Sequence, residues 1–262
     1  MLLEETIAEL RSHHRFRRFA MAGQMRNDRS LEAFVRGQLG FDTGQSETER
    51  KRLSDAARAE IEKARTGGDT RLEIIQATEA SDLARHPFDN MRKERERAMR
   101  ALAKELPAYP WVESVHGFAE LGFTTIVAEA AAVRAPLALS NYQRIDNLWS
   151  RLGFAPYNGH AGSTWKREKW RPHPLTKDEW IAHPFNGARY ALFFSIGDSL
   201  LRAQRPKDKP PGRYGEIYNR RREHTAGTHP DWSKMHSHMD AIRIAMKQLL
   251  CDLWHEWRRA LA

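Results

Sequence analysis

The stretch that decides the fold is Val-His-Gly-Phe-Ala-Glu-Leu-Gly, residues 115–122, which runs directly into the apolar, small-residue segment 123–132. Gly117 can adopt backbone conformations that other residues avoid, so a tight turn fits at this position. Residues 111–115 can form a short helix entered after Pro110, and apolar residues recur at helical spacing after the turn. The sequence therefore predicts two helices joined by a glycine turn, a helix-hairpin-helix.

A helix-hairpin-helix offers backbone N–H groups at a helix N-terminus, where an anion can bind. A phosphate of a nucleic-acid backbone suits such a site, because the contact reads no bases. The alternative is an ordinary corner between two helices of an α-domain, and this segment taken alone favours it. The candidate nucleic-acid-binding residues of the hairpin are His116, Gly117, Ala119, Gly122 and Thr124.

Composition points to an anionic partner. The chain has 262 residues, of which 29% are charged, and a formal net charge of +9. Such an excess favours nucleic acid, because Lys and Arg release its counterions on binding, although a protein can also be basic without such a partner. The single cysteine, Cys251, excludes an internal disulfide framework, and its apolar helical surroundings favour a core role over a nucleophilic one.

The charged first half predicts helices that meet a second chain. Residues 1–45 predict one or two N-terminal helices, with an end at Gly40. Their basic face at 13–18 can lie on phosphates or be solvated. Helices are also expected from a capping Ser46 to Arg65, over 72–83 up to a break at Pro87, and over 91–106. Their apolar stripes are thin, which favours a helical hairpin or coiled coil that forms a homodimer through residues 46–106. A long solvated helix packed on its own domain is the alternative.

The second half, residues 107–262, predicts a third, helical domain. Helices are expected over 140–152, from 175, over 188–201 and over 238–261, and no stretch alternates with the period of a β-strand. The fold class expected for the whole chain is all-α. No apolar segment is long enough to cross a bilayer and no secretory signal pattern is present, so we expect a cytoplasmic, nucleoid-associated protein with no membrane partner.

Four short motifs follow one another in this half: a glycine hairpin with a later Ala-Glu pair, a helix ending in Gly-Phe-Ala-Pro, a Tyr-to-Arg segment, and a final basic-apolar helix. Their positions are Val115-His116-Gly117-Phe118-Ala119 with Ala128-Glu129, Gly153-Phe154-Ala155-Pro156, Tyr214 to Arg222, and Ala245-Met246-Lys247-Gln248-Leu249-Leu250. Together they make residues 109–259 resemble the C-terminal, serine-bearing transposase domain of insertion-sequence transposases that also carry a RuvC-like DEDD nuclease domain and a coiled coil. The resemblance implies DNA binding and a mobile-element or phage origin.

The chain departs from that family at several points. The first forty residues are too few for the RuvC-like domain. The family's catalytic serine falls at His160 or Ala161, so Ser163 is the nearest candidate, and a two-residue offset is serious for a hydroxyl nucleophile. His116 and Ala119 also replace the proline and second glycine of the family's hairpin. These departures predict binding without intrinsic cleavage; the alternative is an active recombinase subunit that uses Ser163 with a RuvC-like nuclease partner in trans.

Basic and aromatic residues outside the hairpin support a nucleic-acid partner. In the loop 158–174, cations alternate with tryptophans, which can stack on an exposed base or simply anchor the loop to the domain. Further basic residues occur at 202–209 and at 220–222. The candidate nucleic-acid-binding residues of these segments are Trp165, Lys166, Arg167, Lys169, Trp170, Arg171, Arg220, Arg221 and Arg222.

Histidines are the remaining candidates for chemistry. His236, His238 and Asp240 are metal-ligating residue types, but their spacing matches no standard zinc signature. We expect no metal and no cofactor, and no pair of carboxylates can be placed together as a nuclease site. The sequence thus favours a nucleic-acid-binding protein, more readily of DNA than of RNA. A dimeric protein-interaction module with an incidental basic surface stays open as an alternative.

Overall fold

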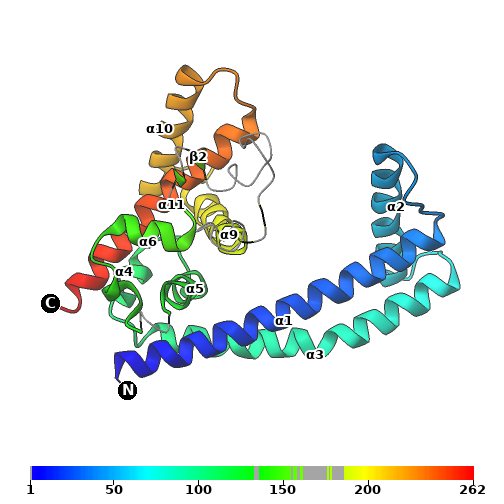
Figure 1. Ribbon diagram of the computed structural model, residues 1–262, viewed down its shortest axis with the longest axis horizontal. Helices are drawn as coiled ribbons and strands as arrows, with labels where there is room; N and C mark the ends of the chain where they lie inside the picture. Colours follow the sequence, from blue (N-terminus) through cyan, green and yellow to red (C-terminus); the bar gives the residue numbers. More distant parts are fainter. Residues whose placement is uncertain are drawn as a thin grey trace. The chain divides into compact units, whose positions relative to one another are not determined.

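The computed structural model is all-α, as the sequence predicted, with one short antiparallel pair formed by β1 (Pro156–Tyr157) and β2 (His160–Ala161) (Figure 1). The elements below come from the part of the chain that the structure describes. That part comprises residues 2–132, 136–154, 156–157, 160–161, 176, 178 and 186–262.

The chain forms two compact units, one of residues 12–98 and one of residues 1–11 with 99–262. The long helices α1 (Leu3–Gln38) and α3 (Leu72–Ala103) contribute to both units. The sequence predicts boundaries near residues 45 and 106, because periodicity shows where a helix ends but not which helix it packs against.

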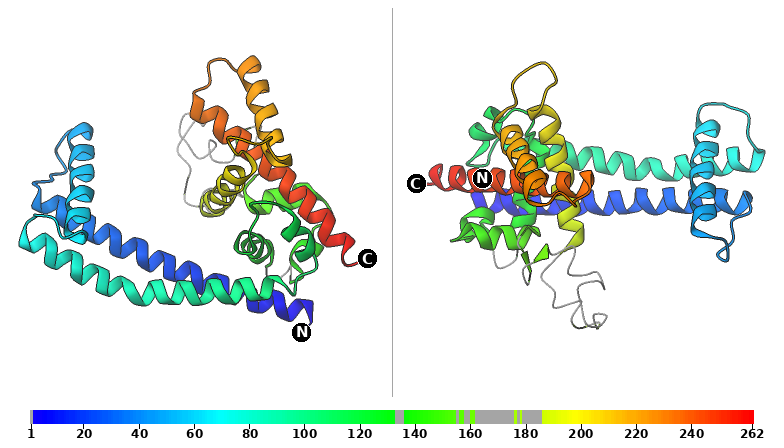
Figure 2. Two further views of the ribbon diagram at one scale, coloured as in Figure 1. Left: turned by 180° about the vertical axis from the view of Figure 1, so that it is seen from behind. Right: turned by 90° about the horizontal axis from the view of Figure 1, so that it is seen from above.

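In the unit of residues 12–98, α1 and α3 run side by side and α2 (Glu47–Arg65) packs at one end of the pair (Figures 1 and 2). Two of its predicted boundaries are confirmed. The Ser46 hydroxyl accepts a hydrogen bond from the Glu49 amide at 3.2 Å, which caps α2. Gly40, with φ of +81°, follows the end of α1. A small core joins the three helices: Leu31, Val35, Ala57, Ile61 and Ile74.

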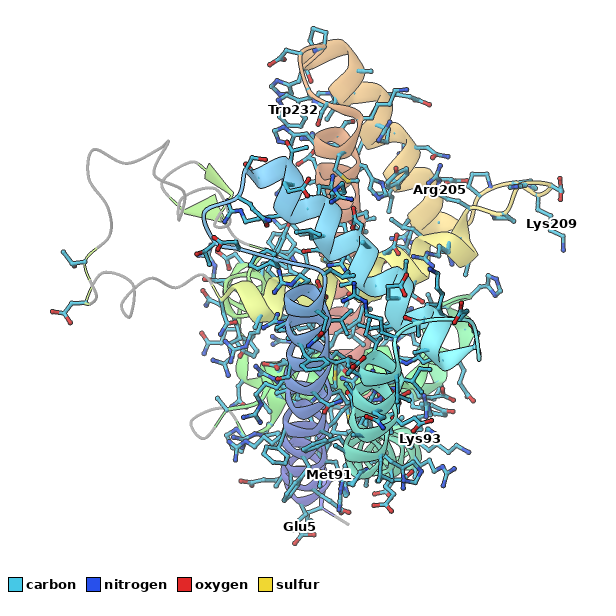
Figure 3. The ribbon with its side chains drawn as sticks, turned by 90° about the vertical axis from the view of Figure 1, so that its right-hand side faces the viewer. Glu5, Met91, Lys93, Arg205, Lys209 and Trp232 are labelled. Carbon is cyan, nitrogen blue, oxygen red and sulfur yellow. The ribbon has the colours of Figure 1, made fainter. Side chains whose placement is uncertain are left out.

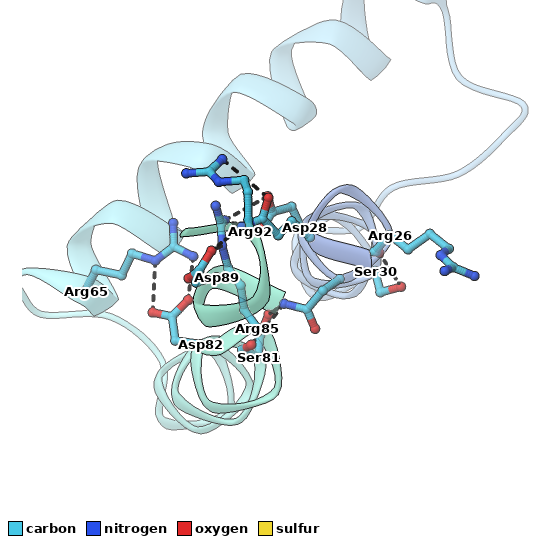
Figure 4. Close-up of polar contacts among 11 residues, drawn as sticks. Arg26, Asp28, Ser30, Arg65, Ser81, Asp82, Arg85, Asp89 and Arg92 are labelled. Carbon is cyan, nitrogen blue, oxygen red and sulfur yellow. Dashed lines mark hydrogen bonds and ion pairs between the residues drawn. The ribbon is translucent and has the colours of Figure 1, made fainter. Parts of the chain in front are cut away.

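Polar contacts hold much of the interface between α1 and α3. Arg85 forms an ion pair with Asp28 at 2.6 Å, and Arg65 of α2 forms one with Asp82 of α3 at the same distance (Figure 4). Pro87 lies inside α3, so the break expected there was wrong. The Phe88 ring of α3 lies against Gly23 of α1, where an added Cβ would be 2.5 Å from a ring carbon, so the two helices approach closely beside the proline.

The second unit contains α4 (Tyr109–Ser114), α5 (Glu120–Ala130), η1 (Ala138–Asn141), α6 (Ile145–Leu152), α9 (Gly187–Gln204), α10 (Arg213–Thr228) and α11 (Lys234–Arg259). Its core is centred on α5 and α11, where the buried rings of Phe123 and Trp257 meet edge to face, 6.3 Å between centroids. Gly197 lets α9 approach α11, since a Cβ at this position would lie 2.6 Å from Met246 Cγ. α10 and α11 form an antiparallel pair (Figures 1 and 2).

The helices expected over 188–201 and 238–261 correspond to α9 and α11, and the one expected over 140–152 is divided into η1 and α6. The helix expected from residue 175 falls outside the described residues. Among the helices of the described ranges, none combines the length and apolarity needed to cross a membrane.

Candidate nucleic-acid interface

The predicted helix-hairpin-helix is present as α4, a turn and α5. Gly117 has φ of +82°, as a tight turn requires. A Cβ on Gly117 would lie 2.3 Å from the Ala203 Cβ, and the Gln204 side-chain amide donates to the His116 carbonyl oxygen at 2.7 Å. The turn is therefore packed against the C-terminal end of α9, and these contacts give the hairpin a structural role.

The hairpin presents negative charge where a phosphate contact was expected. His116, Gly117 and Ala119 are exposed, and no side chain caps the N-terminus of α5. However, the hollow of about 390 Å³ beside the turn is also lined by the acidic residues Glu113 and Glu120. Two carboxylates next to an anion site oppose binding, so the hairpin is a poor place for the main phosphate contact.

The role expected for Thr124 is corrected by its burial. Its side chain is buried, and its hydroxyl donates to the Glu120 carbonyl oxygen at 2.8 Å, one turn back along α5. It therefore offers no donor to a ligand. Gly122 is half-buried, with a phenyl carbon of Phe118 3.4 Å from the position of an added Cβ.

The three consecutive arginines of α10 point in different directions, because successive helix residues are about 100° apart. Arg221 forms an ion pair with Asp240 of α11 at 2.5 Å. The Arg222 guanidinium donates to the Lys234 carbonyl oxygen at 3.0 Å. Arg220 is exposed and has no partner among the described residues. The single patch expected at 220–222 is thus divided, and Arg221 belongs to a different cluster.

Five cations of the described residues, from α6, α9, α10 and α11, are together called the basic cluster below. One group of them contacts Glu129, and the other contacts Asp240 or lies beside it. Its cations are Arg151, Arg189, Arg221, Arg243 and Lys247. The number of positive charges exceeds the number of negative charges, and this excess lies on side chains that are partly withdrawn from water.

Glu129 anchors one end of the basic cluster. Its side chain is 4% exposed and forms an ion pair with Arg189 of α9 at 2.7 Å. The Arg151 guanidinium of α6 donates to the Glu129 carbonyl oxygen at 3.2 Å. An isolated carboxylate inside the apolar helix α5 would be costly, so the arginine is required for this helix to pack.

Asp240 anchors the other end. It accepts hydrogen bonds from Arg221 and Arg243, each at 2.5 Å. Burial alone would raise the pKa of Asp240, but hydrogen bonds from Arg243 and Arg221 outweigh burial and hold the pKa below its usual value. The carboxylate is therefore ionised near neutral pH, and it neutralises one of its two arginines.

Lys247 has no carboxylate partner among the described residues. Its ammonium nitrogen lies over the Trp149 ring, 4.0 Å from the centroid. Burial and the nearby Arg243 lower the pKa of Lys247. An ammonium group that is half-buried beside another cation is electrostatically unsatisfied, and an anion placed against it would relieve this.

Several predicted residues fall outside the described residues. They are the serine and the basic and tryptophan residues of one loop: Ser163, Trp165, Lys166, Arg167, Lys169, Trp170 and Arg171. Their roles stay predictions.

The candidate metal ligands are occupied by other contacts. His238 Nδ1 is 2.7 Å from the Tyr218 hydroxyl, His236 stacks on Trp232, and Asp240 binds two arginines. Within the part of the chain that the structure describes, no three His, Cys, Asp or Glu residues gather into a metal site. Burial raises the pKa of the Cys251 thiol, as does Asp252, which makes it a weaker nucleophile at neutral pH.

Sequence reasoning missed the ion pairs of Glu129 with Arg189 and of Asp240 with Arg221, because the partners of each pair lie on different helices and far apart in the chain. One signal was available. Glu129 is an acid within an apolar helix, and such a residue needs a cation from another element.

No family model, no curated protein and no solved structure matches this chain.

Proposed function

We propose that this chain is a nucleic-acid-binding protein, most readily of DNA, and that the basic cluster holds the phosphate backbone. The observation that carries the proposal is the half-buried Lys247, which lies beside Arg243 and, among the described residues, has no carboxylate partner. The net charge of +9 adds a long-range attraction for a polyanion.

The chemistry of the cluster suits phosphate. Two guanidinium groups are already fixed by Asp240, so they lose little side-chain freedom when a ligand binds. Arg243 and Lys247 can share one phosphate, because its negative charge offsets the repulsion between these two cations. Such contacts read the backbone and not the bases, so binding should depend little on sequence.

The test is fluorescence anisotropy of labelled duplex DNA across a range of salt concentrations, with Lys247→Gln and Arg243→Gln. Each lost phosphate contact should weaken binding and reduce the slope of log K against log salt by about 0.9. The matched control is Lys104→Gln, which removes the same charge at an exposed position outside the cluster and should change the slope little. Equal effects of Lys104→Gln and Lys247→Gln would refute the assignment.

We propose binding without intrinsic strand cleavage. With Mg²⁺, the protein should leave supercoiled plasmid intact. Nicking that is abolished by Ser163→Ala would instead support the alternative of an active recombinase subunit.

Self-association, which the sequence predicts through residues 46–106, is also part of the proposal, with the surface of the unit of residues 12–98 as its interface. Leu83 is 77% exposed on α3, and Phe16 and Phe19 are about half exposed on α1, although the interior between these helices contains several polar contacts. Exposed apolar side chains of this kind suit a helix pair that buries part of its outer surface against a second copy.

A further inference from the structure

Three aromatic rings form a column at the connection between α10 and α11. The imidazole of His229 stacks on the indole of Trp232 with 4.2 Å between centroids and 5° between planes. The imidazole of His236 stacks on the same indole from the other side, at 4.0 Å and 10°. Figure 3 shows Trp232 at the end of the helix pair where α10 connects to α11.

The backbone holds the column in place. His229 follows the last residue of α10, and its amide donates to the Thr225 carbonyl oxygen at 2.9 Å. The Trp232 amide donates to the His229 carbonyl oxygen at 3.1 Å, and the His236 amide donates to the Ser233 hydroxyl at 3.1 Å. All three rings therefore start from fixed backbone positions, and a ligand need not order them.

The column is open at its two ends. Both faces of Trp232 are covered by imidazoles, whereas His229 and His236 are exposed and have no second ring contact among the described residues. A flat aromatic ligand can extend such a column by stacking on an outer imidazole face. Nucleobases are ligands of this kind, and they stack on His as well as on Phe, Tyr and Trp.

The position of the column on α11 connects it with the basic cluster. His236, Asp240, Arg243 and Lys247 are spaced by four, three and four residues, which places them on one side of the helix. His236 and Lys247 are eleven residues apart, or about 16 Å along the axis. One nucleic-acid strand can therefore contact both.

Charge near the column favours the same ligand. Arg220 and Lys234 are exposed and have no ion-pair partner among the described residues, and Arg222 is bonded to a carbonyl oxygen that leaves its charge in place. Glu223 and Asp231 offset only part of this charge.

In a duplex the bases are already stacked on one another, so the base that can stack on the column is an unpaired one.

We infer that the His229–Trp232–His236 column stacks on an unpaired base of the nucleic acid that the basic cluster holds. The inference rests on the proposed function and deepens it, because it makes the protein selective for gapped, tailed or junction-containing DNA over intact duplex.

The test compares the affinity for a blunt duplex with that for the same duplex carrying a short thymine tail, using wild type, His236→Ala and His229→Ala. Wild type should prefer the tailed probe, and at least one variant should lose about tenfold in affinity for it, as expected for one stacked base. Affinity for the blunt duplex should stay unchanged. The control is Met235→Ala, which truncates an exposed neighbour on the same turn and should leave both affinities unchanged.

A structural role for the column predicts a different pattern. In that case the histidine variants lower the melting temperature and weaken both probes equally, which would overturn the inference. Unchanged affinity of both variants for the tailed probe would overturn it as well, while salt-dependent binding of the blunt duplex would leave the proposed function standing. A wild-type protein that binds neither probe would refute the proposed function itself.

Discussion

Replacing Gly117 by alanine tests whether the hairpin has the structural role that its packing indicates. With φ of +82°, the residue is in the left-handed region, where a side chain costs about 1–2 kcal/mol. The new Cβ would also lie 2.3 Å from the Ala203 Cβ and 3.2 Å from the Leu200 carbonyl oxygen. Neither neighbour is the end of a flexible side chain, so α9 must shift, at about 1–3 kcal/mol.

Gly153→Ala is the matched control in the same unit. Gly153 has φ of +86°, but an added Cβ would meet its nearest atom, the Tyr190 Cβ, at an ordinary 3.5 Å. This variant should therefore cost only the conformational part, about 1–2 kcal/mol. Gly117→Ala should cost about 2–5 kcal/mol, the sum of the conformational and packing parts.

The assay is urea unfolding followed by circular dichroism, with the two variants compared at equal slope. A loss of stability for Gly117→Ala that is no larger than for Gly153→Ala would refute the packing argument. The turn would then be free of α9 in solution, and its amides would be available to a ligand.

Two further predictions concern Asp240 and the exposed face of α3. Asp240→Asn should cost about 1–3 kcal/mol at neutral pH, less than a fully buried pair because both arginines are about a quarter exposed. Since the folded-state pKa is lowered, this stabilisation is present above about pH 4 and is lost as pH falls through the folded pKa, so acid unfolding curves of wild type and variant should converge. Light scattering should find a dimer at micromolar concentration that Leu83→Lys converts to monomer and Leu261→Lys does not; a wild-type monomer would contradict self-association.

The helices could be predicted from the sequence wherever their signals are local. Ser46 and Gly40 mark helix ends that the structure shows, and Gly117 has the positive φ that a tight turn demands. Each of these signals acts within a few residues of itself, so no knowledge of the rest of the fold was needed.

The pairing of α1 with α3 could not be predicted in the same way. Its contacts include an ion pair between Arg17 and Glu96 and a hydrogen bond between Asn27 and Ser81, which leave no continuous apolar stripe in either helix. Pro87 led to the wrong prediction of a helix break within α3. The free-energy cost of a proline inside a helix can be read from the sequence, whereas the packing against another helix that offsets this cost cannot.

The basic cluster could not be predicted from the sequence for a related reason. The run Arg220 to Arg222 looks like one patch in the sequence, yet helical geometry sends its members to different partners. Conversely, Glu129 and Arg189 are sixty residues apart and meet only because α5 and α9 pack together. Ion pairs between elements carry little sequence signal beyond an acid in an apolar helix.

Under the proposed function, placing the phosphate contact on α11 instead of the hairpin changes which nucleic acids the protein would distinguish. Backbone amides at a helix N-terminus would hold any phosphate, whereas α11 presents a cation and an aromatic ring on one side, about 16 Å apart. At 3.4 Å per nucleotide along one strand, this separation corresponds to about five steps. A duplex strand that runs along α11 and is held at Lys247 would place an unpaired base at His236 when the distortion lies about five nucleotides from the contacted phosphate. Under the same proposal, selectivity for gapped, tailed or junction-containing DNA would depend on the spacing of two residues along one helix, and not on hydrogen bonds to the bases.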